Sequence, residues 1–161
     1  FTEFAEGINT ISVTDMSNMF YSCSELINLD INNFNTSNVT SMSSMFRYCR
    51  KLKTIPELNC SNVGNINSMC EQCLELTNFG GLENLGMAYL TTMSANYLNY
   101  KLSLNNSDNL THTSLMNVIN NLYDIATKGC KAQSLQLGAT NIAKLTEAEI
   151  AIATSKGWTV S

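Results

Sequence analysis

An eight-residue pattern recurs along the chain and limits the folds open to it. The pattern reads MSNMFYSC at residues 16–23 and MSSMFRYC at 42–49, and a degraded form, INSMCEQC, occupies 66–73. The intervals are 26 and 24 residues, and a valine precedes each occurrence at the same spacing. A catalytic motif rarely occurs three times in one chain, so the pattern indicates a structural repeat.

We name residues 13–38, 39–62 and 63–86 the first, second and third copies, and the eight-residue pattern the octet. A period of about 20–29 residues with regularly spaced aliphatic positions is typical of a leucine-rich-repeat solenoid. In such a fold each repeat supplies a short strand to a parallel sheet. Apolar residues recur in the octet at intervals of three and four, which predicts a short helix. We therefore expect an α/β right-handed solenoid with a parallel sheet of short strands, short helices on the return side and a helical C-terminal cap.

Several apolar positions are shared by all three copies, and we expect them to form a buried ladder in the core. These ladder positions are Met19, Met45 and Met69, then Cys23, Cys49 and Cys73, and finally Leu26, Leu52 and Leu76. The short sequences LDI (29–31), LSL (102–104), LQL (135–137) and WTV (158–160) predict strands in which the outer residues point inward and the middle residue faces solvent. The second and third copies would place Ile55 and Leu58, and Phe79 and Leu82, in the same sheet.

Exposed strand positions are the candidate partner-binding residues, because the open face of such a sheet is a rigid display surface. They are Asn28, Asp30, Thr54, Glu57, Asn78, Ser103 and Gln136. Most of these side chains are small and polar.

The C-terminal third changes character. Apolar positions in 113–129 predict a longer helix that ends at Gly129, and TEAE at 146–149 is a capping box that opens another. We expect 1–105 to be repeats of 24–26 residues, starting inside an incomplete coil, and 106–161 to be an enlarged last coil and cap of the same domain. A weaker fourth copy would include Met87, Met93, Tyr97 and Tyr100, with Tyr100 equivalent to Leu76.

Two longer stretches, VTDMSNMFYSCSELINLDINNFNTSNV and SNVTSMSSMFRYC, resemble the BspA-like leucine-rich repeats of bacterial surface proteins. The resemblance is close from Val13 to about Val63 and then fades, with Cys70 where the family pattern has phenylalanine. It implies a secreted or cell-surface parent protein that attaches to host or extracellular-matrix proteins.

The charge and hydropathy pattern excludes some classes of partner. The formal net charge is −4, only 14% of residues are charged, and the nine basic residues are scattered. Nucleic-acid binding requires clustered Lys and Arg, and a membrane span requires about 20 apolar residues, so we expect neither nucleic-acid binding nor membrane insertion. We expect a monomer without cofactors.

Cysteine and histidine are the only candidates for covalent or metal chemistry. CEQC, from Cys70 to Cys73, has the spacing of a redox or zinc motif, but both cysteines fall on core positions of the repeat. Burial is the favoured reading, and a disulfide or a metal site is the alternative. The single histidine, His112, precedes the expected helix, where a polar or capping role is favoured over pairing with a thiol. We therefore do not expect an enzyme.

Two functions remain. The first is an extracellular protein-interaction module, for adhesion to host or matrix proteins through the sheet face. The second is a structural spacer that displays another domain and binds nothing.

Overall fold

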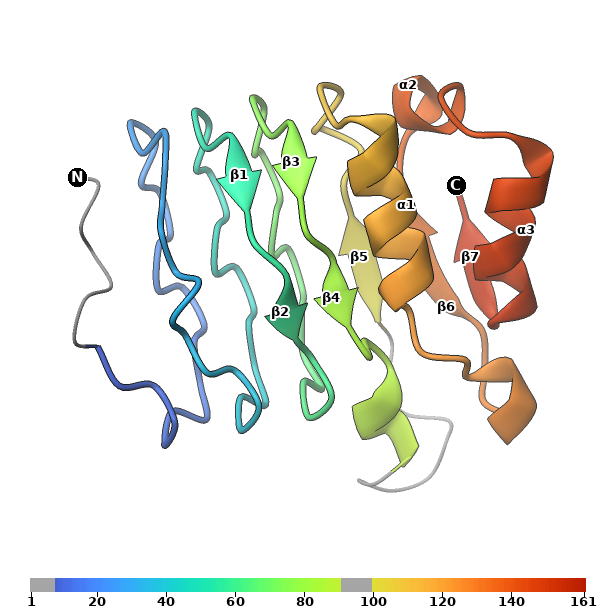
Figure 1. Ribbon diagram of the computed structural model, residues 1–161, viewed down its shortest axis with the longest axis horizontal. Helices are drawn as coiled ribbons and strands as arrows, with labels where there is room; N and C mark the ends of the chain where they lie inside the picture. The colour runs from blue at the N-terminus through green and yellow to red at the C-terminus, as the bar shows by residue number, and fades with distance from the viewer. Residues whose placement is uncertain (1–7, 91–99) are drawn as a thin grey trace.

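The computed structural model describes residues 8–90 and 100–161 as a mixed α/β fold with small parallel sheets and short helices (Figure 1). The strands are β1 (Thr54–Ile55), β2 (Leu58–Asn59), β3 (Asn78–Phe79), β4 (Leu82–Glu83), β5 (Lys101–Ser103), β6 (Gln133–Gln136) and β7 (Trp158–Val160). The helices are α1 (His112–Asn121), α2 (Ala139–Ile142) and α3 (Glu147–Ser155), with 3-10 turns η1 (Met87–Leu90) and η2 (Ala126–Lys128).

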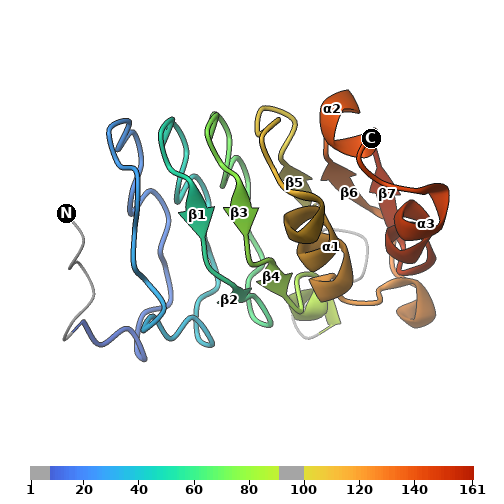
Figure 2. The same ribbon diagram turned by 45° about the horizontal axis from the view of Figure 1, so that its top comes forward.

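The three copies lie side by side, in the order of the sequence (Figures 1 and 2). Parallel bridges join Asp15 to Ser41 and Ser41 to Asn65. In the second and third copies β1 pairs with β3 and β2 with β4, again in parallel. The predicted parallel pairing at the repeat spacing is therefore confirmed.

The predicted octet helix is wrong, because the octet forms two successive four-residue turns. In the second copy Met45 N–H donates to the Met42 carbonyl at 3.2 Å, and Cys49 N–H donates to the Phe46 carbonyl at 3.0 Å. The third residue of each turn, Ser44 (φ 56°) or Tyr48 (φ 64°), is left-handed, as in a type II turn. A helix would require right-handed backbone throughout.

The remaining octet amides join one copy to the next. The N–H groups of Met42, Ser44, Phe46 and Tyr48 donate to carbonyls of the third copy at 2.8–2.9 Å, and those of the first copy donate to the second in the same way. Alternate amides thus close turns within a copy and bond between copies, so the octet backbone is satisfied without a helix.

The single sheet expected from the sequence is also wrong. Residues 100–107 run beside the third octet, since Tyr100 Oη donates to the Val63 carbonyl (2.6 Å) and Ser107 Oγ to the Cys73 carbonyl (3.0 Å). The other side of the core, beside β3 and β4, is taken by α1. Tyr100 is therefore not the equivalent of Leu76, and β5, β6 and β7 form a separate parallel sheet.

Within that separate sheet the register differs slightly from the prediction. Leu102 is opposite Leu135, as expected, but Leu135 is opposite Val160 rather than Trp158. Because the shift is two residues, the side chains keep their inward and outward directions. Trp158 is buried and donates through Nε1 to the Tyr123 carbonyl at 3.0 Å.

The core ladder is buried in two copies and open in the first. The six ladder residues of the second and third copies, Met45, Met69, Cys49, Cys73, Leu52 and Leu76, are at most 1% exposed. In the first copy Met19 is 40% exposed, Cys23 is exposed and Leu26 is only partly buried. The prediction of burial is wrong for Met19 and Cys23, because a described copy lies on only one side of them.

The C-terminal helices follow their predicted signals with one change of boundary. The capping box is confirmed, with Thr146 and Glu149 bonded to each other's backbone amides at the start of α3. The helix α1 is capped by Thr111 and ends at Asn121, well before Gly129, which instead closes η2 in a left-handed conformation. The expected fourth-copy positions Met93 and Tyr97 lie outside the described residues.

Candidate functional site

The predicted partner-binding residues divide among three hollows of the surface. Thr54, Glu57 and Asn78 share one, Ser103 and Gln136 share a second, and Asn28 lies in a third. Asp30 lines none of these and accepts hydrogen bonds from Asn32. The expectation of one continuous display face is therefore wrong, because β1–β4 and β5–β7 are separate sheets.

The first hollow lies between β1, β3 and the first turns of α1, and we name it the strand–helix hollow. Its volume is about 370 Å³. It is lined by Asn32, Thr54, Ile55, Pro56, Glu57, Asn78, Phe79, Gly80, Thr111, Thr113, Ser114 and Asn117. Ile55 and Phe79 are buried, whereas Thr54, Glu57 and Asn78 are exposed. The alternation of side chains along β1 and β3 produces this polar surface over an apolar base.

Two backbone features bring the strands of this hollow together. Thr54 is opposite Asn78 in the parallel register of β1 and β3. A Cβ atom at Gly80 would overlap the backbone of Pro56 and Glu57, so only glycine allows this close approach.

Polar residues on one face of α1 hold the other wall in place. Ser114 Oγ accepts from Phe79 N–H at 2.9 Å and donates to the Thr77 carbonyl at 3.1 Å. Asn121 Nδ2 donates to Glu57 Oε2 at 2.8 Å and fixes that carboxylate. Ser114, Asn117 and Asn121 were not among the candidate residues predicted from the sequence. Their spacing of three and four residues along a predicted helix was the available signal.

The chemistry of the strand–helix hollow is that of a hydrogen-bonding surface with one negative charge. Its side chains supply hydroxyls, amides and the carboxylate of Glu57, and no Lys or Arg lines it. A partner with amide, ammonium or guanidinium donors would satisfy the carboxylate.

The second hollow lies beside the third octet and has a volume of about 350 Å³. It is lined by Asn67, Ser68, Glu71, Lys101, Ser103, Asn105, Asn106 and Gln136. Its polar groups are largely engaged with one another, since Ser103 Oγ donates to Asn105 Oδ1 (2.7 Å) and Glu71 pairs with Arg47 (3.1 Å). Ser103 and Gln136 are only partly exposed.

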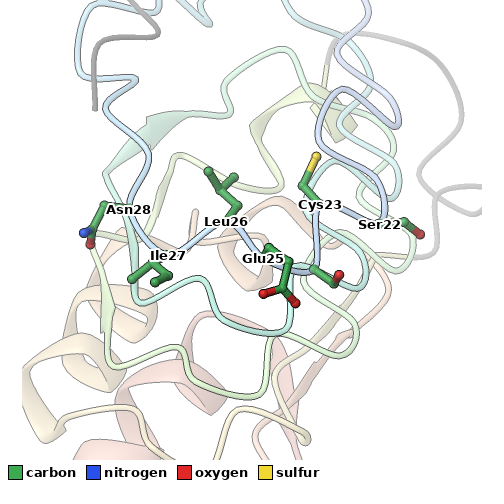
Figure 3. A pocket seen from close by; sticks show the side chains of 7 residues that line it. Ser22, Cys23, Glu25, Leu26, Ile27 and Asn28 are labelled. Carbon is green, nitrogen blue, oxygen red and sulfur yellow. The ribbon is translucent and has the colours of Figure 1, made fainter. Parts of the chain in front are cut away.

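The third hollow, of about 560 Å³, is formed by residues 22–28 of the first copy (Figure 3). Cys23, Leu26 and Ile27 give it a mainly apolar surface, with Glu25 and Asn28 at its edge.

The cysteines are free thiols, and four of the six are buried. Burial raises the pKa of Cys49 to about 12, and burial also raises the pKa of Cys60. A hydrogen bond with Cys73, together with burial, raises the pKa of Cys70. Only the thiolate is a nucleophile or a metal ligand, so these buried thiols are unreactive at neutral pH. Both cysteines of CEQC, Cys70 and Cys73, are buried, as expected.

His112 serves to connect two helices. Its Nε2 lies 2.9 Å from Glu149 Oε1, which links the start of α1 to the start of α3. Among the described residues, its hydrogen-bond partner is this carboxylate and not a thiol.

Within residues 8–90 and 100–161, no group of three or more His, Cys, Asp or Glu side chains could hold a metal ion. The helices found there are all too short or too polar to cross a bilayer.

Comparison with known proteins gives one match. Searches of curated proteins and of solved structures returned nothing significant. The model of one family, described as "Mycoplasma protein of unknown function, DUF285", matches residues 1–110, more than half of the chain. The matched segment includes the three octets and strands β1–β5, among them the two strands of the strand–helix hollow. The chain belongs to the DUF285 family.

Proposed function

We propose that the chain is a protein-interaction module of the BspA-like leucine-rich-repeat type, displayed outside the cell as a right-handed solenoid. The parallel pairing of the three copies at intervals of 26 and 24 residues supports the solenoid. The resemblance of the octets to BspA-like repeats supports the surface location.

The observation that carries this proposal is the strand–helix hollow, where Thr54, Glu57 and Asn78 meet. Backbone pairing and the contacts of α1 fix the walls, so little conformational entropy is lost on binding. A volume of about 370 Å³ holds a few side chains of a protein loop. The partner is a host or matrix protein whose loop presents hydrogen-bond donors to Glu57.

The same observations support a non-enzymatic role. The buried cysteines have raised pKa values and His112 is paired with Glu149. A thiol enzyme would require an activated cysteine next to a histidine base. The buried cysteines and His112 do not form such a pair.

Arginine substitution at the rim of the hollow tests the proposal. Thr54→Arg and Asn78→Arg place a long cation over the base of the hollow while leaving the backbone pairing of β1 and β3 intact. Ala148→Arg, on the exposed side of α3, is the matched control. Each purified variant is applied to immobilised matrix proteins and epithelial cell surfaces.

We expect the wild type and Ala148→Arg to bind, and each rim variant to bind at least tenfold more weakly. Binding by the rim variants at wild-type strength, with unchanged circular dichroism, would exclude the hollow as the contact site.

The spacer role is the second candidate, and one observation favours it. The large exposed apolar side chains of the described residues are Ile8, Ile11, Met19, Tyr21, Ile27, Leu74 and Met87, and none lines the strand–helix hollow. The buried core of a protein–protein interface is usually rich in apolar and aromatic side chains. A folded chain that binds none of the matrix proteins or cell surfaces would support the spacer and refute the adhesion module.

A further inference from the structure

The octet side of the molecule carries two hollows that the proposed function does not use. The second hollow, of about 350 Å³, lies between the third octet, β5 and β6. A fourth hollow, of about 370 Å³, is lined by Ser22 and Ser24 of the first copy and by Tyr48 and Arg50 of the second. The strand–helix hollow lies on the other side of the core, beside α1. The two octet-side hollows therefore form a surface of their own.

A row of side-chain contacts joins these two hollows. Arg47 stacks on Tyr48, with the guanidinium carbon 4.9 Å from the ring centroid, and Tyr48 lines the fourth hollow. The same Arg47 pairs with Glu71 at 3.1 Å, and Glu71 lines the second hollow. A ligand made of several linked units can therefore occupy both hollows at once.

The row follows the direction in which the copies are stacked. Ser22 and Tyr48 hold the same octet position in the first and second copies, and Arg47 and Glu71 hold the same position in the second and third. Neighbouring octets are hydrogen-bonded side by side as parallel strands are, so equivalent side chains recur about every 4.8 Å. One pyranose ring advances a linear polysaccharide by a similar length. The spacing of the copies therefore suits a linear polymer of sugar rings.

The second hollow offers side-chain amides that the fold leaves free. Most asparagine side chains of the described residues are hydrogen-bonded within the fold. Asn67, Asn106 and Gln136 line the second hollow, and their side chains make no hydrogen bond to another described residue. Each amide both donates and accepts, as a sugar hydroxyl does. These amides are therefore suited to binding a polyhydroxylated ligand.

The unpaired charges that line the two hollows are positive. Glu71 is neutralised by its ion pair with Arg47. Lys101 in the second hollow and Arg50 in the fourth are exposed, and neither forms an ion pair with a described residue. A ligand with one negative charge near each of them would pair with both. Because the formal net charge of the chain is −4, attraction of a polyanion has to come from such local cations.

A protein loop fits this surface less well. None of the large exposed apolar side chains of the described residues lines either hollow. The core of a protein–protein interface is usually rich in apolar and aromatic side chains. Free amides, hydroxyls and cations match a polyhydroxylated anion instead.

We propose that the octet side is a second binding site, for a linear acidic polysaccharide that lies along the stacking direction of the copies. Lys101 and Arg50 bind carboxylate or sulfate groups on two of its sugars. Asn67, Asn106 and Gln136 form hydrogen bonds with its ring hydroxyls. This site is separate from the strand–helix hollow and does not depend on the function proposed for that hollow.

Titration of the whole chain with oligosaccharides tests the proposal. The probes are fluorescently labelled octasaccharides of hyaluronan, which carries carboxylates, and of heparin, which carries sulfates, together with a neutral chitin oligosaccharide. Lys101→Glu and Arg50→Glu reverse the two charges. Lys128→Glu is the matched control, because Lys128 is exposed in η2 and lines neither hollow. Binding is followed by fluorescence anisotropy, and the fold of each variant by circular dichroism.

We expect at least one acidic octasaccharide to bind the wild type, and the neutral oligosaccharide to bind at least tenfold more weakly. Lys101→Glu and Arg50→Glu should each bind the acidic probe at least tenfold more weakly than Lys128→Glu does. Binding of hyaluronan would identify carboxylates as the paired groups, and binding of heparin would identify sulfates. Equal weakening by all three substitutions would mean that only net charge matters, and the proposal would be overturned. Failure of both acidic probes to bind the wild type would overturn it as well.

A milder substitution tests the amide contacts. Serine occupies the position of Asn67 in the first and second octets, so Asn67→Ser introduces a residue that the octet turn already accepts. It should weaken binding of the acidic octasaccharide about threefold to tenfold, whereas Thr54→Arg, in the strand–helix hollow, should bind as the wild type does. Unchanged binding by Asn67→Ser would contradict the proposed hydrogen bonds. Loss of binding in a folded Thr54→Arg variant would place the polysaccharide on the other side of the core, and the proposal would be wrong.

Discussion

Replacement of methionine by alanine at one repeat position should have very different effects in different copies. Met19 and Met45 occupy the same position of the octet, but Met19 is 40% exposed and Met45 is fully buried. Full burial of a methionine side chain stabilises by about 1.5–3 kcal/mol. Met19 retains a little over half of that burial and its removal leaves no closed cavity, so Met19→Ala should cost about 1–2 kcal/mol.

Met45→Ala should cost about 2–5 kcal/mol, because the full transfer free energy of the removed atoms is lost and a cavity remains between the flanking copies. For a chain of this size, each kcal/mol corresponds to about 2–4 °C in Tm. Met69→Ala, at 1% exposed, should match Met45→Ala rather than Met19→Ala. Free energies of unfolding are measured by urea titration with far-ultraviolet circular dichroism.

Fluorescence of Trp158 is a second probe of the same transitions, since this buried residue lies in β7, at the opposite end of the chain from the first copy. Equal losses at Met19 and Met45, with coincident transitions by both probes, would refute the assignment of an open side to the first copy. Separate transitions would instead mean that the copies unfold in sequence.

Four further outcomes are expected. Thiol labelling should modify Cys23 well before Cys60, as followed by mass spectrometry, and equal rates would contradict the burial of Cys60. Gly80→Ala should destabilise the fold strongly, because the added Cβ would meet the backbone of the neighbouring copy. Gly129→Ala has open space around it and should cost only about 1–2 kcal/mol, because its backbone is left-handed. Calorimetric Tm values compare the two variants. Burial raises the pKa of Cys60, so its thiol ionises at a lower pH in the unfolded chain than in the folded one. The free energy of unfolding should therefore fall above about pH 8.5, by up to about 1.4 kcal/mol per pH unit. The slope should be shallower in Cys60→Ala. Hydrogen bonds from the Thr146 backbone and hydroxyl lower the pKa of Glu149, so its stabilisation is present above about pH 4.3 and is lost as the pH falls; urea titrations should show a weaker acid dependence in Glu149→Gln.

The repeat spacing was the part of the fold that the sequence predicted well. Side chains that recur every 24–26 residues can be buried together only if the copies lie in register, and β1 and β3 pair at the expected offset. The capping box at Thr146 was equally predictable, because its hydrogen bonds are local.

The octet was misassigned because its apolar spacing fits two structures. Intervals of three and four place apolar side chains on one helix face, but they also place them at the corners of two consecutive turns. The distinguishing residues are those at the left-handed positions, Asn18 and Ser22 in the first copy and Ser44 in the second. Asparagine tolerates that conformation and both residue types are weak helix formers, a signal that favours turns.

The candidate site could be predicted only in part, because it depends on contacts distant in sequence. Thr54, Glu57 and Asn78 were identified from strand alternation alone. The wall formed by α1 depends on where the part of the chain that follows the third copy places Ser114 and Asn121. Local sequence patterns do not specify this position. Ser103 was assigned to the same face as Thr54 and Asn78 for the same reason. In the structure β5 lies beside the third octet rather than beside β3.

The one-way ladder between octets also determines how the chain would respond to a pulling force. The first copy and β7 lie at opposite ends of the row of copies (Figure 1), so tension between them acts along the inter-copy hydrogen bonds. Each copy is held mainly by its neighbours, so the outermost copy should detach first. With 24–26 residues per copy, each detachment would lengthen the chain by up to about 85 Å. A surface-anchored chain of this design would extend in steps under load while the remaining copies stay folded.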